Sequence, residues 1–244
     1  RVPQDHGEVD AAMKAVWAIY RANFREYARN PAVLAFTVIM PLLLAVFLSL
    51  IMGNQELFTI DYYLPNMLGI SLMWLGVFAT AQPLVEQREQ KIFRRMAVTP
   101  LSRQSMLWGQ VLFRVSVGLF QAAVFLIAGR IGFGVRVQGS WFLLLGATVM
   151  GALVFVTMGY VLAGLARSQE AAPVIAQPVQ MGMMFLSSTL LPSAMLPAGA
   201  RVVVRAIPLT YVADALRQTI SAVPPMFPLW VDFAAMADSW AFTR

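Results

Sequence analysis

Residues 62–85 read YYLPNMLGISLMWLGVFATAQPLV, and residues 86–103 read EQREQKIFRRMAVTPLSR. The first stretch has 24 residues and no charge. At a rise of about 1.5 Å per helical residue, it is long enough to cross a hydrocarbon core of about 30 Å. The second stretch holds five basic residues and two acidic ones. An apolar span followed at once by a basic connection is typical of a multi-pass membrane protein.

The composition of the whole chain agrees with this interpretation. Of the 244 residues, 59% are hydrophobic and 12% are charged, against about one quarter charged in soluble domains. So few charges cannot cover the surface of a soluble domain, which excludes that class. The chain has no cysteine and one histidine, His6, so we expect no disulfide scaffold, iron–sulfur cluster or other metal site.

Apolar runs elsewhere predict an all-α helical bundle of five membrane spans. The runs cover residues 32–52, 62–85, 104–129, 137–166 and 172–191. Pro41 should kink the first span. Arg114 is the lone charge inside the third, and we expect it to act between helices as a structural group rather than in transport. Small residues four apart in the fourth span, Ala147/Gly151 and Gly159/Ala163, favour close helix packing.

The two ends of the chain differ from these spans. Residues 11–29 form a basic amphipathic pattern, which predicts an interfacial helix or a juxtamembrane extension of the first span. Pro192, Pro197 and Pro208 predict a broken, partly re-entrant and extracytoplasmic element over residues 192–220. Its last piece, LTYVADALRQTISA, is expected to be an extracytoplasmic helix at the membrane interface. Residues 229–244 are too short for a sixth span and are expected to be an incomplete final span. Either the chain ends after five spans, or the natural sequence is cut or altered near residue 235.

Charge positions within the broken element and between the spans are also informative. Asp214 and Arg217 are three residues apart, a spacing that permits an ion pair across one helical turn. The basic residues gather on residues 11–29 and 86–103, which places both segments in the cytoplasm. Residues 86–98 predict either a short helix that docks a soluble partner or an ordinary positive-inside loop.

Several kinds of chemistry are excluded or poorly supported. The only lysines, Lys14 and Lys91, do not lie in a phosphate-binding loop, and no base accompanies a nucleophile, so we expect no enzyme activity. The chain has a net charge of +6. Its basic residues lie between the apolar runs and do not form a basic stripe with aromatic residues, which disfavours binding to nucleic acid. An ion-coupled carrier needs ionisable groups within its membrane spans, and Arg114 alone is poor support for such a carrier.

Two separated motifs carry a family resemblance. The string REQKIFRRMAVTPLSR at 88–103, followed by WGQVLFR ending at Arg114, resembles the coupling-helix region of type-2 ABC exporter permeases. FLSSTLLPSAMLP at 185–197 and IPLTYVADALRQ at 207–218 resemble the signature of the same family. The resemblance covers about residues 11–235. The chain departs from the family pattern at Ser188, at Gln90-Lys91 and in lacking a final sixth span.

The resemblance implies a permease subunit of an ATP-driven exporter in a prokaryotic plasma (inner) membrane, with its N-terminus in the cytoplasm. This chain would bind no cofactor, and a separate ATPase subunit would bind ATP and Mg. Two permease chains, as a homodimer or heterodimer within membrane lipid, would form the path. Helices at 11–29 and 86–98 would contact the ATPase. The implied coupling residues are Glu86, Arg88, Glu89, Lys91, Phe93, Arg94 and Arg95.

A transport path would lie along the second and fifth spans, at the seam between two chains. The expected lining residues are Met73, Trp74, Met183, Met184, Phe185 and Ser187. Methionines on such faces also serve packing or lipid contact. The lack of buried charge in these two spans favours a hydrophobic or amphipathic substrate such as a drug, a lipid or a lipid-linked glycan. Two other functions stay open at this point: an ion-coupled secondary carrier, and a membrane scaffold subunit without transport.

Overall fold

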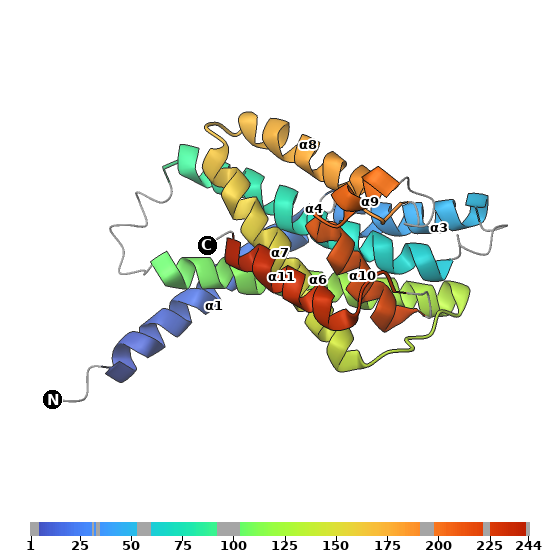
Figure 1. The fold of residues 1–244 in the computed structure, drawn as a ribbon. Coiled ribbons are helices and arrows are strands. Elements are labelled where there is room, and N and C mark those ends of the chain that lie inside the picture. Colours follow the sequence, from blue (N-terminus) through green and yellow to red (C-terminus); the bar gives the residue numbers. More distant parts are fainter. Residues whose placement is uncertain are drawn as a thin grey trace.

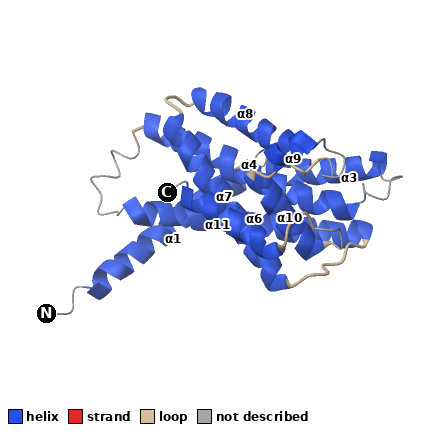
Figure 2. Ribbon diagram, in the orientation of Figure 1, coloured by secondary structure: helices blue, strands red, loops and turns tan. Residues whose placement is uncertain are grey.

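The computed structural model describes residues 5–30, 32, 35–52, 60–91, 103–190, 198–221 and 225–242. Within these ranges every regular element is a helix and no strand occurs (Figure 2). Several of the helices are long and strongly apolar, as the sequence requires. The predicted all-α membrane bundle is therefore confirmed.

In the described part of the chain, three helices are long and apolar enough to cross a membrane. They are α4 (Ile60–Glu89), α6 (Arg103–Phe133) and α7 (Trp141–Leu165), and they contain most of the runs predicted at 62–85, 104–129 and 137–166. Helix α4 contacts α3, α6, α7, α8 and α10, and its most extensive contact is with α7 (Figure 1). Because it is surrounded in this way, α4 forms the centre of the bundle, with Tyr63, Leu64, Leu68 and Leu72 almost fully buried.

The predicted first and fifth spans contain shorter apolar helices. A π-helical segment, η1 (Ala35–Ile39), leads into α3 (Met40–Met52), and α8 covers Ala171–Leu186. The π-helical segment ends just before Pro41, which has no N–H to continue the regular hydrogen-bond ladder. Helix α8 ends where Ser187 adopts an extended backbone, with φ −85° and ψ 165°.

The N-terminal helix α1 (Asp5–Arg29) begins before the predicted segment at 11–29 and projects obliquely from the bundle (Figure 1). It packs on the first half of α6. The Tyr20 ring lies 6.1 Å from the Phe113 ring, and its hydroxyl donates to the Ser116 hydroxyl at 3.2 Å. A β-carbon at Gly109 would lie 2.9 Å from the Ile19 β-carbon, so the glycine permits this close approach.

Helices α9 (Ala198–Val204) and α10 (Pro208–Ile220) form the described part of the predicted broken element. Pro208 occupies the start of α10, where its missing N–H costs no hydrogen bond, whereas Pro192 and Pro197 lie outside the described residues. The sequence predicted an interfacial helix at this point. Instead α10 is buried among α4, α7 and α11 (Leu229–Phe242), because its polar groups pair with one another and with neighbouring segments.

The predicted separate coupling helix at 86–98 needs a correction at its start. Helix α4 continues without a break through Glu86, Arg88 and Glu89. It stops where Lys91 adopts a left-handed backbone with φ 55°. The helix does not end with its apolar run. The first predicted coupling residues therefore lie on the last turn of α4 and not on a separate helix. Phe93, Arg94 and Arg95 lie outside the described residues.

Candidate functional site

A pocket of about 410 Å³ opens between η1, α4 and α8. The rings of Phe36 and Trp74 stack at its wall, with their centroids 4.8 Å apart. Trp74 is in the middle of α4, so the pocket lies at the depth of the membrane-spanning segment. The lining residues are Phe36, Trp74, Phe78, Pro173, Gln177, Gln180, Met181 and Met184. None of these side chains is charged, so the pocket suits an apolar molecule.

The structure brings only part of the predicted path together. Trp74 and Met184 line the pocket from opposite helices. Met73 and Met183 are buried in the core, and Phe185 is 60% exposed on the outer face of α8. Ser187 is buried, and its hydroxyl donates to the Met184 carbonyl at 3.2 Å. The role of these residues in transport stays a prediction.

Two pocket residues that the sequence analysis did not select are Gln177 and Gln180. They lie three residues apart on α8, within a run that carries no charge. Gln180 is 6% exposed, and its amide nitrogen has no hydrogen-bond partner. Two amides three residues apart in an apolar span could have pointed to these residues in the sequence, because polar side chains are rare inside membrane spans.

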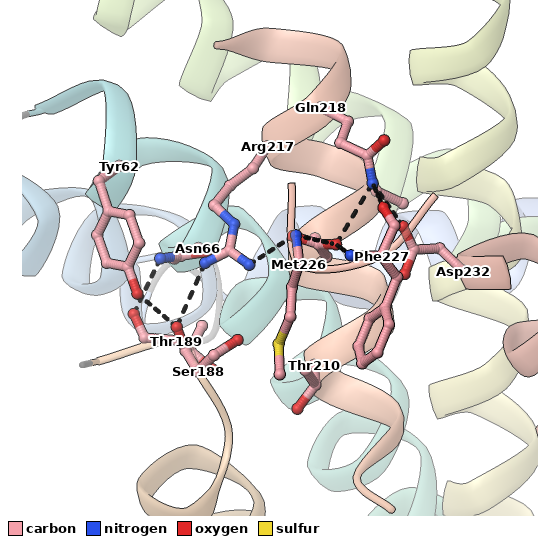
Figure 3. Close-up of polar contacts among 12 residues, drawn as sticks. Tyr62, Asn66, Ser188, Thr189, Thr210, Arg217, Gln218, Met226, Phe227 and Asp232 are labelled. Atoms are coloured by element: carbon pink, nitrogen blue, oxygen red, sulfur yellow. Dashed lines mark hydrogen bonds and ion pairs between the residues drawn. The ribbon is translucent and has the colours of Figure 1, made fainter. Parts of the chain in front are cut away.

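A buried polar cluster lies where α10 meets α11 and the residues preceding α11 (Figure 3). The Asp214 carboxylate pairs with Arg217 at 2.7 Å, which confirms the ion pair predicted from the three-residue spacing. It also accepts hydrogen bonds from the backbone N–H groups of Met226 and Phe227, at 3.0 Å and 2.9 Å. Asp214 thereby holds residues 226–227 against α10.

The same cluster reaches α4 and the end of α8. The Arg217 guanidinium lies 5.3 Å from the centre of the Tyr62 ring and donates to the Ser188 carbonyl at 3.4 Å. Tyr62 donates to that carbonyl at 2.5 Å, and Asn66 donates to the Thr189 carbonyl at 3.0 Å (Figure 3). These bonds fix the backbone that leaves α8 against the first turns of α4.

Helix α11 contributes one acid to the cluster. The Gln218 amide donates to Asp232 at 2.7 Å and to Asp214 at 3.3 Å, so it bridges the two carboxylates. The other Asp232 oxygen is buried without a partner. Nearby, burial and the Asp232 carboxylate raise the pKa of the Tyr211 phenol, and its hydroxyl donates to the Arg205 carbonyl at 2.5 Å.

The opposite end of α4 carries the charged residues of the coupling prediction. Arg88 donates to the carbonyls of Ala163 and Ala166 at the end of α7, and Glu89 accepts from the Gln169 N–H at 3.0 Å. Lys91 is exposed. The described part of this end thus joins α4 to the turn between α7 and α8.

Arg114 is 5% exposed and donates to the carbonyl of Ala79 on α4 at 3.1 Å. On α6 itself it bonds the Gln110 carbonyl at 3.4 Å, and the Gln110 side chain accepts from Tyr160 of α7 at 2.9 Å. These contacts join three helices, which supports a structural function for Arg114.

Comparison with known proteins agrees with this architecture. Residues 14–221 match the model of the ABC-2 type transporter family. The chain belongs to the ABC-2 type transporter family. It is also 24% identical over 165 residues, 68% of this chain, to ABC transporter G family member 20 from Dictyostelium discoideum. The matched part covers 23% of that relative, so the chain spans about a quarter of its length.

Family membership confirms the resemblance drawn from the two motifs, and it gives the sites a common setting. The matched residues contain α4, α6, α7, α8 and α10 and therefore the pocket, the charged end of α4 and the part of the polar cluster on α4, α8 and α10, whereas Met226, Phe227 and Asp232 follow the matched residues. This ABC-2 type chain is a multi-pass membrane protein of an ABC transporter.

Proposed function

We propose that this chain is the permease subunit of an ATP-driven exporter for a hydrophobic or amphipathic substrate. A separate ATPase subunit supplies the ATP and Mg chemistry, and a second permease chain completes the path. The proposal sets the charged end of α4 in the cytoplasm of a prokaryotic cell, together with the N-terminus. The proposal is supported by family membership and by the continuity of helix α4 from its charged end to the pocket and the polar cluster.

The observation that carries the proposal is the continuity of α4. One unbroken helix of 30 residues bears Glu86 and Glu89 at its charged end, Trp74 at the pocket and Tyr62 in the polar cluster. Tyr62 and Glu86 are 24 positions apart, which corresponds to about 36 Å along the helix axis. A displacement at the charged end is therefore transmitted to the pocket and to the opposite end.

The mechanism is a two-state movement without chemistry in the membrane. ATP binding closes the partner ATPase, and contact with the end of α4 and residues 92–98 tilts the attached helices. Arg88 and Glu89 fasten α4 to the turn between α7 and α8, so these helices move as one body. The pocket between α4 and α8 then changes shape or access.

Pocket chemistry supports the substrate class. The lining consists of aromatic, thioether and amide side chains and one proline, with no charged side chain among its described members. Apolar pockets with a few polar groups suit hydrophobic molecules that carry limited hydrogen-bonding capacity. A drug, a lipid or a lipid-linked glycan fits that description.

The first experiment is affinity purification of the tagged chain from membranes in mild detergent, with mass spectrometry and an ATPase assay of the eluate. A P-loop ATPase should copurify, and the double variant R94E/R95E should lose it. The matched control is R130E/R136E, which makes the same charge change at exposed arginines near the far end of α6. Equal ATPase recovery from all three chains would contradict docking at residues 86–98.

Flux separates the proposal from the two functions that the sequence left open. An exporter stops when ATP is depleted, whereas a secondary carrier continues under an imposed proton gradient. A scaffold subunit shows no flux, and changes at residues 86–98 alter only assembly.

A further inference from the structure

The pocket between η1, α4 and α8 contains one feature that an apolar substrate alone does not explain. Gln180 lines it, is 6% exposed, and has a buried amide nitrogen without any protein partner. Buried amides in native proteins almost always have a partner, so an exception needs a reason. At membrane depth the reason is stronger, because little water is available to bind the amide.

The position of Gln180 within the pocket defines what can reach it. Across the pocket, α4 contributes Trp74, the fifteenth residue of a 30-residue helix, and Gln180 is the tenth residue of the 16-residue α8, so both side chains start from the middle part of their helices. The Phe36 ring stacks on Trp74 with an interplanar angle of 28°, which gives the pocket a flat aromatic wall. A ring or planar group of a ligand fits such a wall.

The charge of the ligand follows from the lining. None of the eight described lining residues is charged. Bringing an ionised group into such a site would cost its hydration without providing a counter-ion. A neutral group with an oxygen acceptor does not carry that cost, and it gives the Gln180 amide its missing partner. Rotation about the last side-chain bond lets the amide present its N–H groups to that acceptor.

We propose that this pocket binds a neutral amphipathic molecule with an aromatic or planar body, and that Gln180 donates a hydrogen bond to a carbonyl, ether or hydroxyl oxygen of it. The inference deepens the permease function proposed above and rests on it. Gln180 is thereby the residue that selects oxygen-bearing molecules over pure hydrocarbons of the same shape. Gln177, one turn earlier, is exposed, so its amide is not buried without a partner as the Gln180 amide is, and it contributes little to this selection.

The test uses Trp74 as a reporter inside the pocket. The chain has six tryptophans, and the other five are replaced by phenylalanine in the full chain, which is placed in lipid nanodiscs with a tryptophan-free scaffold. Two probes are compared: para-bromoacetophenone, which has a carbonyl acceptor, and para-bromoethylbenzene, which has nearly the same shape without oxygen. The ring bromine of either probe quenches an indole that it contacts.

We expect the ketone to quench Trp74 at a lower concentration than the hydrocarbon probe. Gln180→Met, which keeps the unbranched side chain, should weaken the ketone about fivefold and leave the hydrocarbon probe unchanged or stronger, as expected for one lost hydrogen bond. Gln180→Leu is the second variant in case the first does not fold. Gln138→Met is the matched control: it makes the same change at an exposed glutamine outside the pocket and should keep the preference of the parent chain.

Two results would overturn the inference. Equal quenching by both probes, unchanged in Gln180→Met, would show a pocket that binds without the Gln180 hydrogen bond. Absence of quenching by either probe would show that a second copy of the chain or an acyl chain covers the pocket. Neither result bears on ATPase copurification, because this assay contains no ATPase, so the proposed function is judged separately.

Discussion

Arg114 of α6 donates a hydrogen bond at 3.1 Å to the carbonyl oxygen of Ala79 on α4. In an uninterrupted α-helix, the N–H of the residue four positions later would bond that carbonyl. That residue is Pro83, which has no N–H. A guanidinium from a neighbouring helix therefore replaces the backbone bond that the proline removes.

This relationship predicts coupling between positions 114 and 83. Arg114→Met should lower the free energy of unfolding by about 1–3 kcal/mol, the usual cost of a buried group left without a partner. In the Pro83→Ala background the same substitution should cost less, because an alanine at this position provides the missing N–H. Thermal unfolding of the four chains in nanodiscs measures the cycle. An equal cost of Arg114→Met in both backgrounds would show that the two positions act independently.

A second prediction concerns the crossing of α4 and α7. A β-carbon at Gly159 would lie 2.2 Å from the Gly76 carbonyl oxygen and 2.9 Å from the Thr80 β-carbon. Gly159→Ala should therefore force the two helices apart and destabilise the chain by about 1–3 kcal/mol or more. The midpoint of thermal unfolding should fall by several degrees.

Gly164→Ala is the control for that experiment. It makes the same change on the same helix, where no atom lies within 4 Å of the added carbon. If Gly164→Ala and Gly159→Ala lower the midpoint equally, the close crossing is not what the glycine provides.

The small-residue spacing in α7 was readable from the sequence, and the structure confirms close packing there. Gly151 meets Val212 of α10, and Ala147 and Ala163 are buried. The partner of Gly159 was not identified from the sequence, although Gly76 and Thr80 on α4 have the same four-residue spacing of small residues. The spacing of small residues within one helix shows which face permits close packing. Which helix packs on that face depends on the three-dimensional arrangement.

Helix α10 shows the same division. The three-residue spacing predicted the Asp214–Arg217 pair, which is present. The sequence also favoured an extracytoplasmic helix at the membrane interface. The structure buries the pair because Met226, Phe227 and Ser188, all outside the helix that carries it, supply its hydrogen-bond partners. A local sequence pattern does not show hydrogen-bond partners that lie far away in the sequence.

The third prediction follows from those partners. Asp214→Ala should destabilise the chain by about 3–5 kcal/mol, because it leaves the Arg217 guanidinium buried without its counter-ion. Hydrogen exchange at the Met226 and Phe227 amides should become faster, since both donate to the Asp214 carboxylate. The double variant D214A/R217M should recover part of the stability but not the slow exchange.

Asp238→Ala serves as the matched control, because this acid is on α11 and is exposed. It should leave both the unfolding midpoint and the two amides unchanged. Slow exchange at Met226 and Phe227 in D214A would argue against the Asp214 carboxylate as the group that holds them.

The fourth prediction separates two kinds of charged residue at the end of α4. Arg88 bonds carbonyls of α7, so it joins helices of the same chain. Arg88→Gln should keep ATPase association but lower the flux driven by ATP in proteoliposomes, because α4 no longer moves with α7.

Glu86→Ala should instead weaken association with the ATPase about two- to fivefold, as expected when a solvent-accessible charge pair is removed. Copurified ATPase per chain and flux per ATP hydrolysed distinguish the two effects, with Lys91→Ala as an exposed neighbour for comparison. Should Arg88→Gln lose the ATPase to the same extent as Glu86→Ala, Arg88 would have to contact the ATPase itself, and the tie to α7 would not be its function.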